Sequence, residues 1–122
     1  MIWLNAGAIA LGGAAGALCR YFLSVLLHEK LGTAFPYGTL AINLLACLLL
    51  GVTVSFCLRH PEMPIYWKLL AITGFLGGFS TFSTFGLESF ELLLNQPLSG
   101  FIYLFSSLAG GLAMIALGLK AF

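Results

Sequence analysis

Charged residues are what this sequence most lacks. Only 7% of its 122 residues are Asp, Glu, Lys or Arg, whereas a soluble domain carries about 25%. With 61% hydrophobic residues and a mean hydropathy of +1.07, the chain has too few charged groups to cover a surface that faces water. A soluble fold is therefore excluded. The long uncharged runs predict an integral membrane protein with a single domain.

Groups that perform catalysis or bind transition metals are also missing. The chain has no aspartate, no H-E-x-x-H sequence and no phosphate-binding loop followed by lysine, so we do not expect an enzyme. Cys19, Cys47 and Cys57 stand singly in apolar segments, which is typical of small buried residues and not of a metal cluster or a disulfide framework. The net charge of +1, without basic runs, argues against nucleic acid as a partner.

Four apolar segments predict four transmembrane helices, which together form one domain over residues 1–122. The segments cover residues 4–27, 37–58, 65–94 and 98–119. Polar residues and prolines separate them: His28–Lys30 marks the first loop, Arg59–Pro64 the second and Asn95–Pro97 the third. The sequence therefore predicts an all-α fold with short connections.

The third segment is too long for a simple span. About 30 residues of helix reach roughly 45 Å, well beyond the ~30 Å hydrocarbon core of a bilayer. Gly77 and Gly78 lie near its middle, and each weakens a helix by about 1 kcal/mol relative to alanine. We therefore predict a break near Gly77–Ser80. Irregular backbone at this depth must be covered by protein or water, as in the discontinuous helices of transporters.

The residues around this break have an unusual composition. The stretch GFLGGFSTFSTF, Gly74–Phe85, combines glycines with four hydroxyl residues, Ser80, Thr81, Ser83 and Thr84. Its phenylalanines Phe79, Phe82 and Phe85 recur every three residues, so in a continuous helix they would share one face. Hydroxyl groups and aromatic rings beside irregular backbone predict an ion site.

Isolated polar residues in the other spans each have two interpretations. Arg20 either extends to the membrane surface or lines an aqueous vestibule that attracts anions. Asn43 either bonds another helix or turns its amide toward a passing anion. Tyr103 and Ser107 are four residues apart and share a helix face, where they form either a hydroxyl track for an ion or bonds between helices.

Glu88 and Glu91 lie one turn apart near the end of the third span. They are expected at the membrane surface or paired with Arg20 or Lys30.

The distribution of positive charge hardly favours one orientation in the membrane. Arg59, Lys68 and Lys120 lie on one side, against Lys30 and, if it reaches the surface, Arg20 on the other. So weak a bias permits insertion in both directions. Four helices are also too few to enclose much of a pore. We therefore expect an oligomer, with an antiparallel dimer of oppositely inserted copies as the hypothesis.

Three stretches, taken in order, resemble a known family. GGAAGALCRY (Gly12–Tyr21), GTLAINLLA (Gly38–Ala46) and GFLGGFSTFSTFGLE (Gly74–Glu88) are similar to the small four-helix fluoride channels called Fluc or CrcB. The resemblance covers essentially the whole chain. It implies a passive, fluoride-selective channel in the bacterial plasma or inner membrane, which lowers cytoplasmic fluoride. It also implies an antiparallel, dual-topology homodimer with two pores.

The same resemblance implies roles for individual residues. The pore residues would be Asn43, Phe82, Phe85, Tyr103 and Ser107, and Arg20 would be the vestibule arginine. The backbone carbonyls of Gly77 and Ser80 would hold a structural Na+ on the dimer axis. Many members continue the track with a hydroxyl four residues after Ser107, but this chain has Gly111 and then Ile115. Ser83, Thr84 or Ser106 are alternatives for that position.

Two other classes of membrane protein share some of these features. A small multidrug-resistance-type transporter has the same size and helix number, but it needs a membrane-embedded carboxylate, and residues 4–27 contain none. A membrane scaffold that does not transport would use the small-residue face Ala8, Gly12 and Gly16 for packing. It leaves the break in the third helix unexplained.

Overall fold

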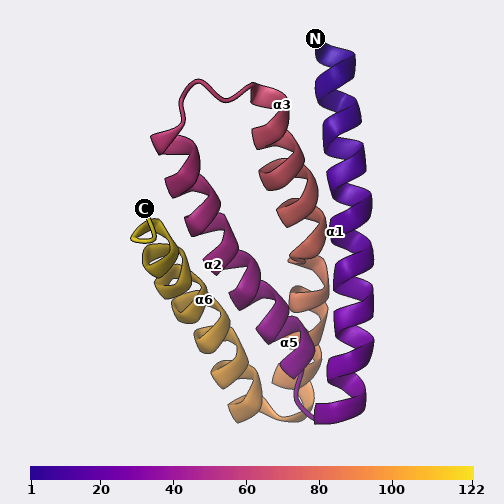
Figure 1. Cartoon of the computed structure of the whole chain (residues 1–122). Coiled ribbons are helices and arrows are strands. Elements are labelled where there is room, and N and C mark those ends of the chain that lie inside the picture. Colours follow the sequence, from indigo (N-terminus) through magenta and orange to yellow (C-terminus); the bar gives the residue numbers. More distant parts are fainter.

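Four helical segments run alternately down and up the molecule (Figure 1), and the computed structural model describes all residues from Met1 to Phe122. Three segments are continuous: α1 (Ile2–Leu31), α2 (Tyr37–Arg59) and α6 (Pro97–Leu119). The third consists of α3 (Ile65–Lys68), the π-helix η1 (Leu69–Leu76), α4 (Gly77–Phe79) and α5 (Ser83–Asn95). All four are long and apolar enough to cross a membrane. The predicted all-α fold with four spanning helices is confirmed.

The first helix is longer than its apolar run. It continues through His28–Lys30, so the prediction of a loop there was wrong. Its backbone hydrogen bonds persist until Gly32, whose φ of 78° turns the chain and whose N–H donates to the His28 carbonyl at 3.0 Å. Glycine adopts this left-handed conformation without steric cost, and it therefore ends the helix.

The helices pack in two main pairs, α2 with α6 and α1 with η1. In the second pair, a Cβ atom on Gly12 or Gly16 would overlap the backbone oxygens of Leu70 and Phe75. The predicted small-residue face of α1 therefore packs within the chain and lets two backbones approach closely. The buried core, Ile42, Ala46 and Phe79, lies where α2 meets α4.

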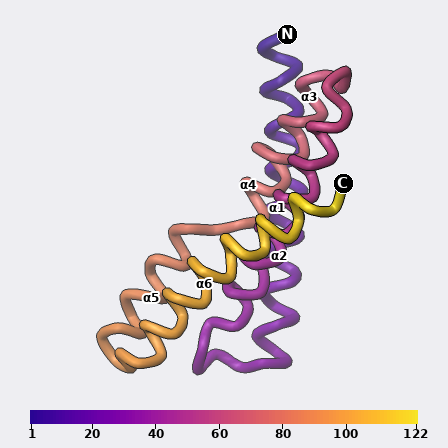
Figure 2. Tube along the Cα trace, turned by 90° about the vertical axis from the view of Figure 1, so that its left-hand side faces the viewer, coloured from indigo at the N-terminus to yellow at the C-terminus, as the bar shows by residue number.

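The predicted break in the third helix is confirmed, and it lies at the end of the expected range. Gly77 and Gly78 are still helical, and the chain leaves the helix at Ser80, where ψ is 161°. Figure 2 shows the trace running sideways from α4 to α5 at this level. The Ser80 hydroxyl donates to the Leu76 carbonyl at 2.8 Å and covers a group at the helix end. Weak helix propensity at the two glycines does not itself interrupt the helix.

The break also separates the phenylalanines that were expected on one face. Phe79 belongs to the core and is 3% exposed, whereas Phe82, just after the break, is 80% exposed. The face prediction was wrong because it assumed a continuous helix through Ser80–Phe82.

In the loop between α2 and α3, His60 Nδ1 lies 3.2 Å from Glu62 Oε1, within hydrogen-bond distance. A backbone hydrogen bond at Glu62, followed by the His60 side chain, lowers the pKa of Glu62 below its usual range. This carboxylate lies outside the membrane spans, far from the break.

Candidate ion-binding site at the helix break

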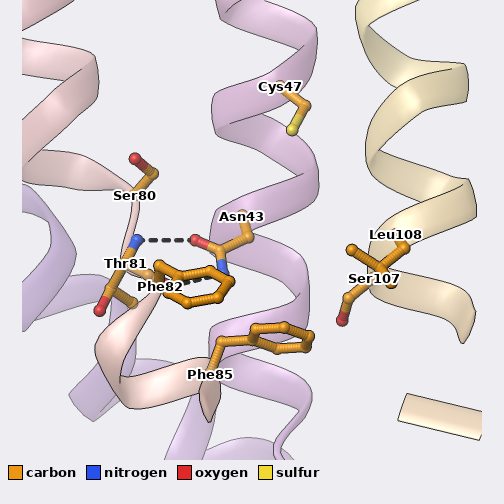
Figure 3. Close-up of a pocket in the computed structure, with 8 residues that line it drawn as sticks. All are labelled: Asn43, Cys47, Ser80, Thr81, Phe82, Phe85, Ser107 and Leu108. Atoms are coloured by element: carbon orange, nitrogen blue, oxygen red, sulfur yellow. Dashed lines mark hydrogen bonds between the residues drawn. The ribbon is translucent and has the colours of Figure 1, made fainter. Parts of the chain in front are cut away.

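Asn43 on α2 holds the broken segment through both ends of its side-chain amide. Its Nδ2 donates to the Thr81 carbonyl at 2.9 Å, and its Oδ1 accepts from the Thr81 backbone N–H, also at 2.9 Å (Figure 3). Thr81 lies between α4 and α5, where helical partners are lost. The asparagine therefore satisfies two backbone groups that would otherwise be unpaired inside a membrane. Its Nδ2 keeps a second N–H that remains free to donate.

A cavity of about 230 Å³ opens beside this contact. Its lining residues come from α2, the break, α5 and α6: Asn43, Cys47, Ser80, Thr81, Phe82, Phe85, Ser107 and Leu108. The cavity brings together Asn43, Phe82, Phe85 and Ser107, which the sequence analysis had selected from three separate spans. A partly polar space at this depth is suited to a small ion or water.

Aromatic rings line one side of the cavity. The rings of Phe82 and Phe85 are 5.8 Å apart between centroids and inclined at 53°. Both rings extend toward α6 (Figure 3). Phe85 also contacts Tyr103, with centroids 5.2 Å apart. Because the edge of a phenyl ring carries partial positive charge, rings presented edge-on attract an anion.

The two polar residues predicted on α6 differ in their bonding. Tyr103 is fully buried and donates its hydroxyl to Glu88 Oε1 at 3.1 Å. Glu88 therefore pairs with the tyrosine and not with Arg20 or Lys30. One turn further along α6, the Ser107 hydroxyl oxygen is buried and has no hydrogen-bond partner. A buried hydroxyl without a partner is costly, so Ser107 retains a donor and an acceptor that no group of this chain satisfies.

Arg20 lies beside the break but not in the cavity. Its side chain is half-buried, and its Nε donates to the Gly78 carbonyl at 3.0 Å. The guanidinium therefore lies at the break, near the middle of the third span and not at the membrane surface. Its charge acts on the last turn of α4.

Two carbonyl groups at the break have lost their helical donors. The Thr81 N–H, which would bond the Gly77 carbonyl in a continuous helix, donates to Asn43. The Thr84 N–H, which would bond the Ser80 carbonyl, donates to Thr81 Oγ1 at 3.3 Å. These oxygens are acceptors suited to a hard cation. No group of three His, Cys, Asp or Glu side chains is placed to hold a metal ion.

Ser83 and Thr84 do not join the cavity. Both are exposed at the start of α5.

Comparison with known proteins agrees with the motifs. Residues 7–119 match the family described as CrcB-like protein, Camphor Resistance (CrcB). The chain belongs to the CrcB family. Among curated CrcB relatives, a protein from Acidobacterium capsulatum is 42% identical over 112 residues, which cover 91% of this chain and 90% of the relative. One from Cupriavidus pinatubonensis is 48% identical over 113 residues, 92% of this chain and 89% of the relative. Both carry the name fluoride-specific ion channel FluC.

Two residues of the cavity in this CrcB chain, Cys47 and Leu108, were not predicted from the sequence as site residues. A signal for Cys47 was present, because it follows Asn43 by four residues and so lies on the same face of α2. Nothing in the sequence distinguishes Leu108 from the other leucines of α6.

Proposed function

We propose that this chain is a fluoride-specific ion channel of the bacterial plasma membrane. The observation that carries the proposal is the cavity at the helix break, in a chain whose CrcB-family relatives bear that name. There, the Asn43 amide, two phenyl rings and the unpartnered Ser107 hydroxyl meet at membrane depth. A channel moves its ion without chemical change, which agrees with the lack of a catalytic constellation.

The chemistry of the cavity suits fluoride. Fluoride is the smallest and most strongly hydrated halide, so a narrow pore must replace much of its water shell. The free Asn43 N–H, the Ser107 hydroxyl and the edges of Phe82 and Phe85 are donors or positive edges that do this. Tyr103 extends the same track toward Glu88. Chloride, which is larger, is penalised by the size of such a path.

Other residues predicted from the sequence act at the ends of this ion path. Arg20 raises the local concentration of anions at a vestibule while it holds the Gly78 carbonyl. Ser83 and Thr84 contribute hydroxyls from the exposed start of α5, where a second copy of the chain completes the pore.

A structural Na+ is held by backbone carbonyls of the break. The two carbonyls implied by the family resemblance, Gly77 and Ser80, are those whose helical donors are taken by Asn43 and Thr81. Carbonyl oxygen is the ligand type that Na+ prefers. The cation offsets the partial negative charge of these groups and joins the two copies at their common axis.

The functional unit is an antiparallel homodimer in which each copy is one four-helix domain. The support is physical: Phe82 is a cavity residue, yet it is 80% exposed in the single chain. A second copy would cover this ring and close the cavity. The near balance of positive charge between the two sides allows both orientations.

Passive export follows from the membrane potential. Hydrogen fluoride enters cells uncharged and dissociates, and an inside-negative potential favours anion exit by about 2.3 kcal/mol per charge per 100 mV. The channel therefore lowers cytoplasmic fluoride without ATP. No observation favours a small multidrug-resistance-type transporter, since family membership supports the channel.

The test uses purified protein in liposomes loaded with KF, with Na+ present on both sides of the membrane. On addition of valinomycin, which carries the balancing K+, a fluoride electrode should record rapid efflux. Liposomes without protein are the control. Efflux no faster than this control, from protein shown to be inserted, would refute the proposal.

A further inference from the structure

We propose that the Cys47 thiol is a polar step of the ion path, placed in the space that Gly111 leaves open on the facing helix. This inference rests on the proposed function and deepens it. It assigns a role to a residue that composition alone describes as a small buried hydrophobe.

Cys47 stands at the junction of two cavities. The first, of about 230 Å³, contains Asn43 and Ser107. The second, of about 190 Å³, extends toward Leu76 and Gly77. Only Cys47 and Ser80 line both. The Ser80 hydroxyl already donates to the Leu76 carbonyl at 2.8 Å, so the thiol is the side-chain donor left at this junction.

The facing helix is shaped around the thiol. Gly111 is buried on α6, and a Cβ atom added there would lie 3.3 Å from Cys47 Sγ. This distance is tighter than an ordinary contact, so the site accommodates either the thiol from α2 or a side chain from α6. In this chain α2 supplies it.

The thiol also continues the existing polar track. Tyr103, Ser107 and Gly111 follow one another at four-residue spacing on α6, and the track of side-chain polar groups ends at Ser107. Cys47 lies above Asn43 on α2 and shares the first cavity with Ser107 (Figure 3). The Ser107 hydroxyl oxygen is buried and has no hydrogen-bond partner within the chain, so the same cavity holds a second polar group that is free to bond an ion.

The chemistry sets the size of the expected effect. A neutral thiol is a weak donor, and a thiolate would repel an anion. Cys47 therefore acts as S–H and lowers the barrier for fluoride between stronger donors, without forming a tight site. Its removal should reduce the flux by a modest factor, whereas loss of a main pore residue should reduce it more.

Four variants separate a polar role from simple filling of space, and fluoride efflux from liposomes is the readout. Cys47→Ser keeps a donor and should stay within about twofold of the unmodified chain. Cys47→Ala should lower the flux by about fivefold, as expected for one lost weak hydrogen bond. Cys47→Ala/Gly111→Ser supplies a hydroxyl from α6 and should restore the flux. Cys47→Ala/Gly111→Ala restores volume alone and should not.

The outcomes that overturn the inference are distinct. Unchanged flux in Cys47→Ala would do so, as would equal recovery in the Gly111→Ser and Gly111→Ala double variants. Absence of flux from the unmodified chain would remove the proposed function and this inference with it. Size-exclusion elution of each variant checks its folding.

A chemical probe tests the same point without changing Cys47. Mercuric chloride replaces the thiol proton with a sulfur–mercury bond and releases HCl. In a Cys19→Ala/Cys57→Ala background, it should block efflux, and the further change Cys47→Ser should abolish the block. Full flux of the background protein in mercuric chloride would show that the thiol does not face the path and would overturn the inference.

Discussion

The side-chain amide of Asn43 donates to and accepts from the Thr81 backbone, with both distances at 2.9 Å. This paired contact ties α2 to the middle of the third span at the point where its helix is interrupted. It also fixes the direction of the amide, so that one N–H remains for the cavity. The two interpretations of Asn43, as a bond between helices and as an anion donor, are therefore compatible.

The first prediction concerns this contact. Asn43→Asp keeps an acceptor for the Thr81 N–H but loses the donor to the Thr81 carbonyl and adds negative charge to the path. We expect a loss of stability of about 1–3 kcal/mol and little fluoride flux, measured by thermal unfolding in detergent and by efflux. Asn95→Asp, at the exposed end of α5, is the control. Equal stability of the two variants would contradict the role of the amide in holding the break.

The second prediction separates the two phenylalanines. Phe82→Ile and Phe85→Ile should each slow fluoride efflux by about tenfold or more, equivalent to at least 1.4 kcal/mol in the barrier, while the dimer still forms. Phe85→Ile should also lower thermal stability, because Phe85 is 7% exposed and packs on Tyr103. Phe82 is mostly exposed within the chain, so its replacement should leave the fold of one copy intact. Unchanged flux in both variants would remove these rings from the pore.

The third prediction tests the close packing of α1. An added methyl group in Gly16→Ala would overlap the Phe75 carbonyl, and overpacking of this kind costs about 1–3 kcal/mol. Gly7→Ala, in the same helix, has nothing within 4 Å and should be neutral. Unfolding temperatures in detergent compare the two. If the two alanine variants unfold at the same temperature, α1 does not pack on η1 as described.

The fourth prediction concerns the proposed Na+. Replacement of Na+ by the larger K+ throughout purification and reconstitution should weaken the dimer or its fluoride flux, because the Gly77 and Ser80 carbonyls would no longer fit the cation. Size-exclusion chromatography and efflux follow the two effects, and return of Na+ should reverse them. Indifference to the exchange would argue against a central cation.

Much of the fold follows from composition and length. The four spans are visible as uncharged runs, and the third combines excess length with the paired glycines Gly77 and Gly78. Length alone does not require a break, since α1 runs unbroken over 30 residues. The sequence predicted the position of the break only approximately. Helix propensity indicated Gly77 and Gly78, but the chain leaves the helix at Ser80, where a hydroxyl and a side chain from α2 replace backbone bonds. Such long-range contacts are not encoded in local propensity.

Only part of the site could be predicted from the sequence, because its residues meet through contacts between different helices. Asn43 and Ser107 stood out as polar residues in apolar helices, and the structure brings them to one cavity with Phe82 and Phe85. Cys47 has the composition of a small apolar residue, and its spacing of four residues from Asn43 was the one sequence signal for it; the structure adds Gly111 on the facing helix. The π-helix Leu69–Leu76 left no signal in hydropathy, and in the structure it packs against α1.

The central claim is selectivity for fluoride, and one measurement tests it most directly. Liposomes that contain the unmodified protein, equal KF and KCl inside and Na+ on both sides receive valinomycin, and separate electrodes follow the two anions. The account predicts rapid loss of fluoride while chloride leaves no faster than from liposomes without protein. Equal release of both anions, or of neither, would contradict it.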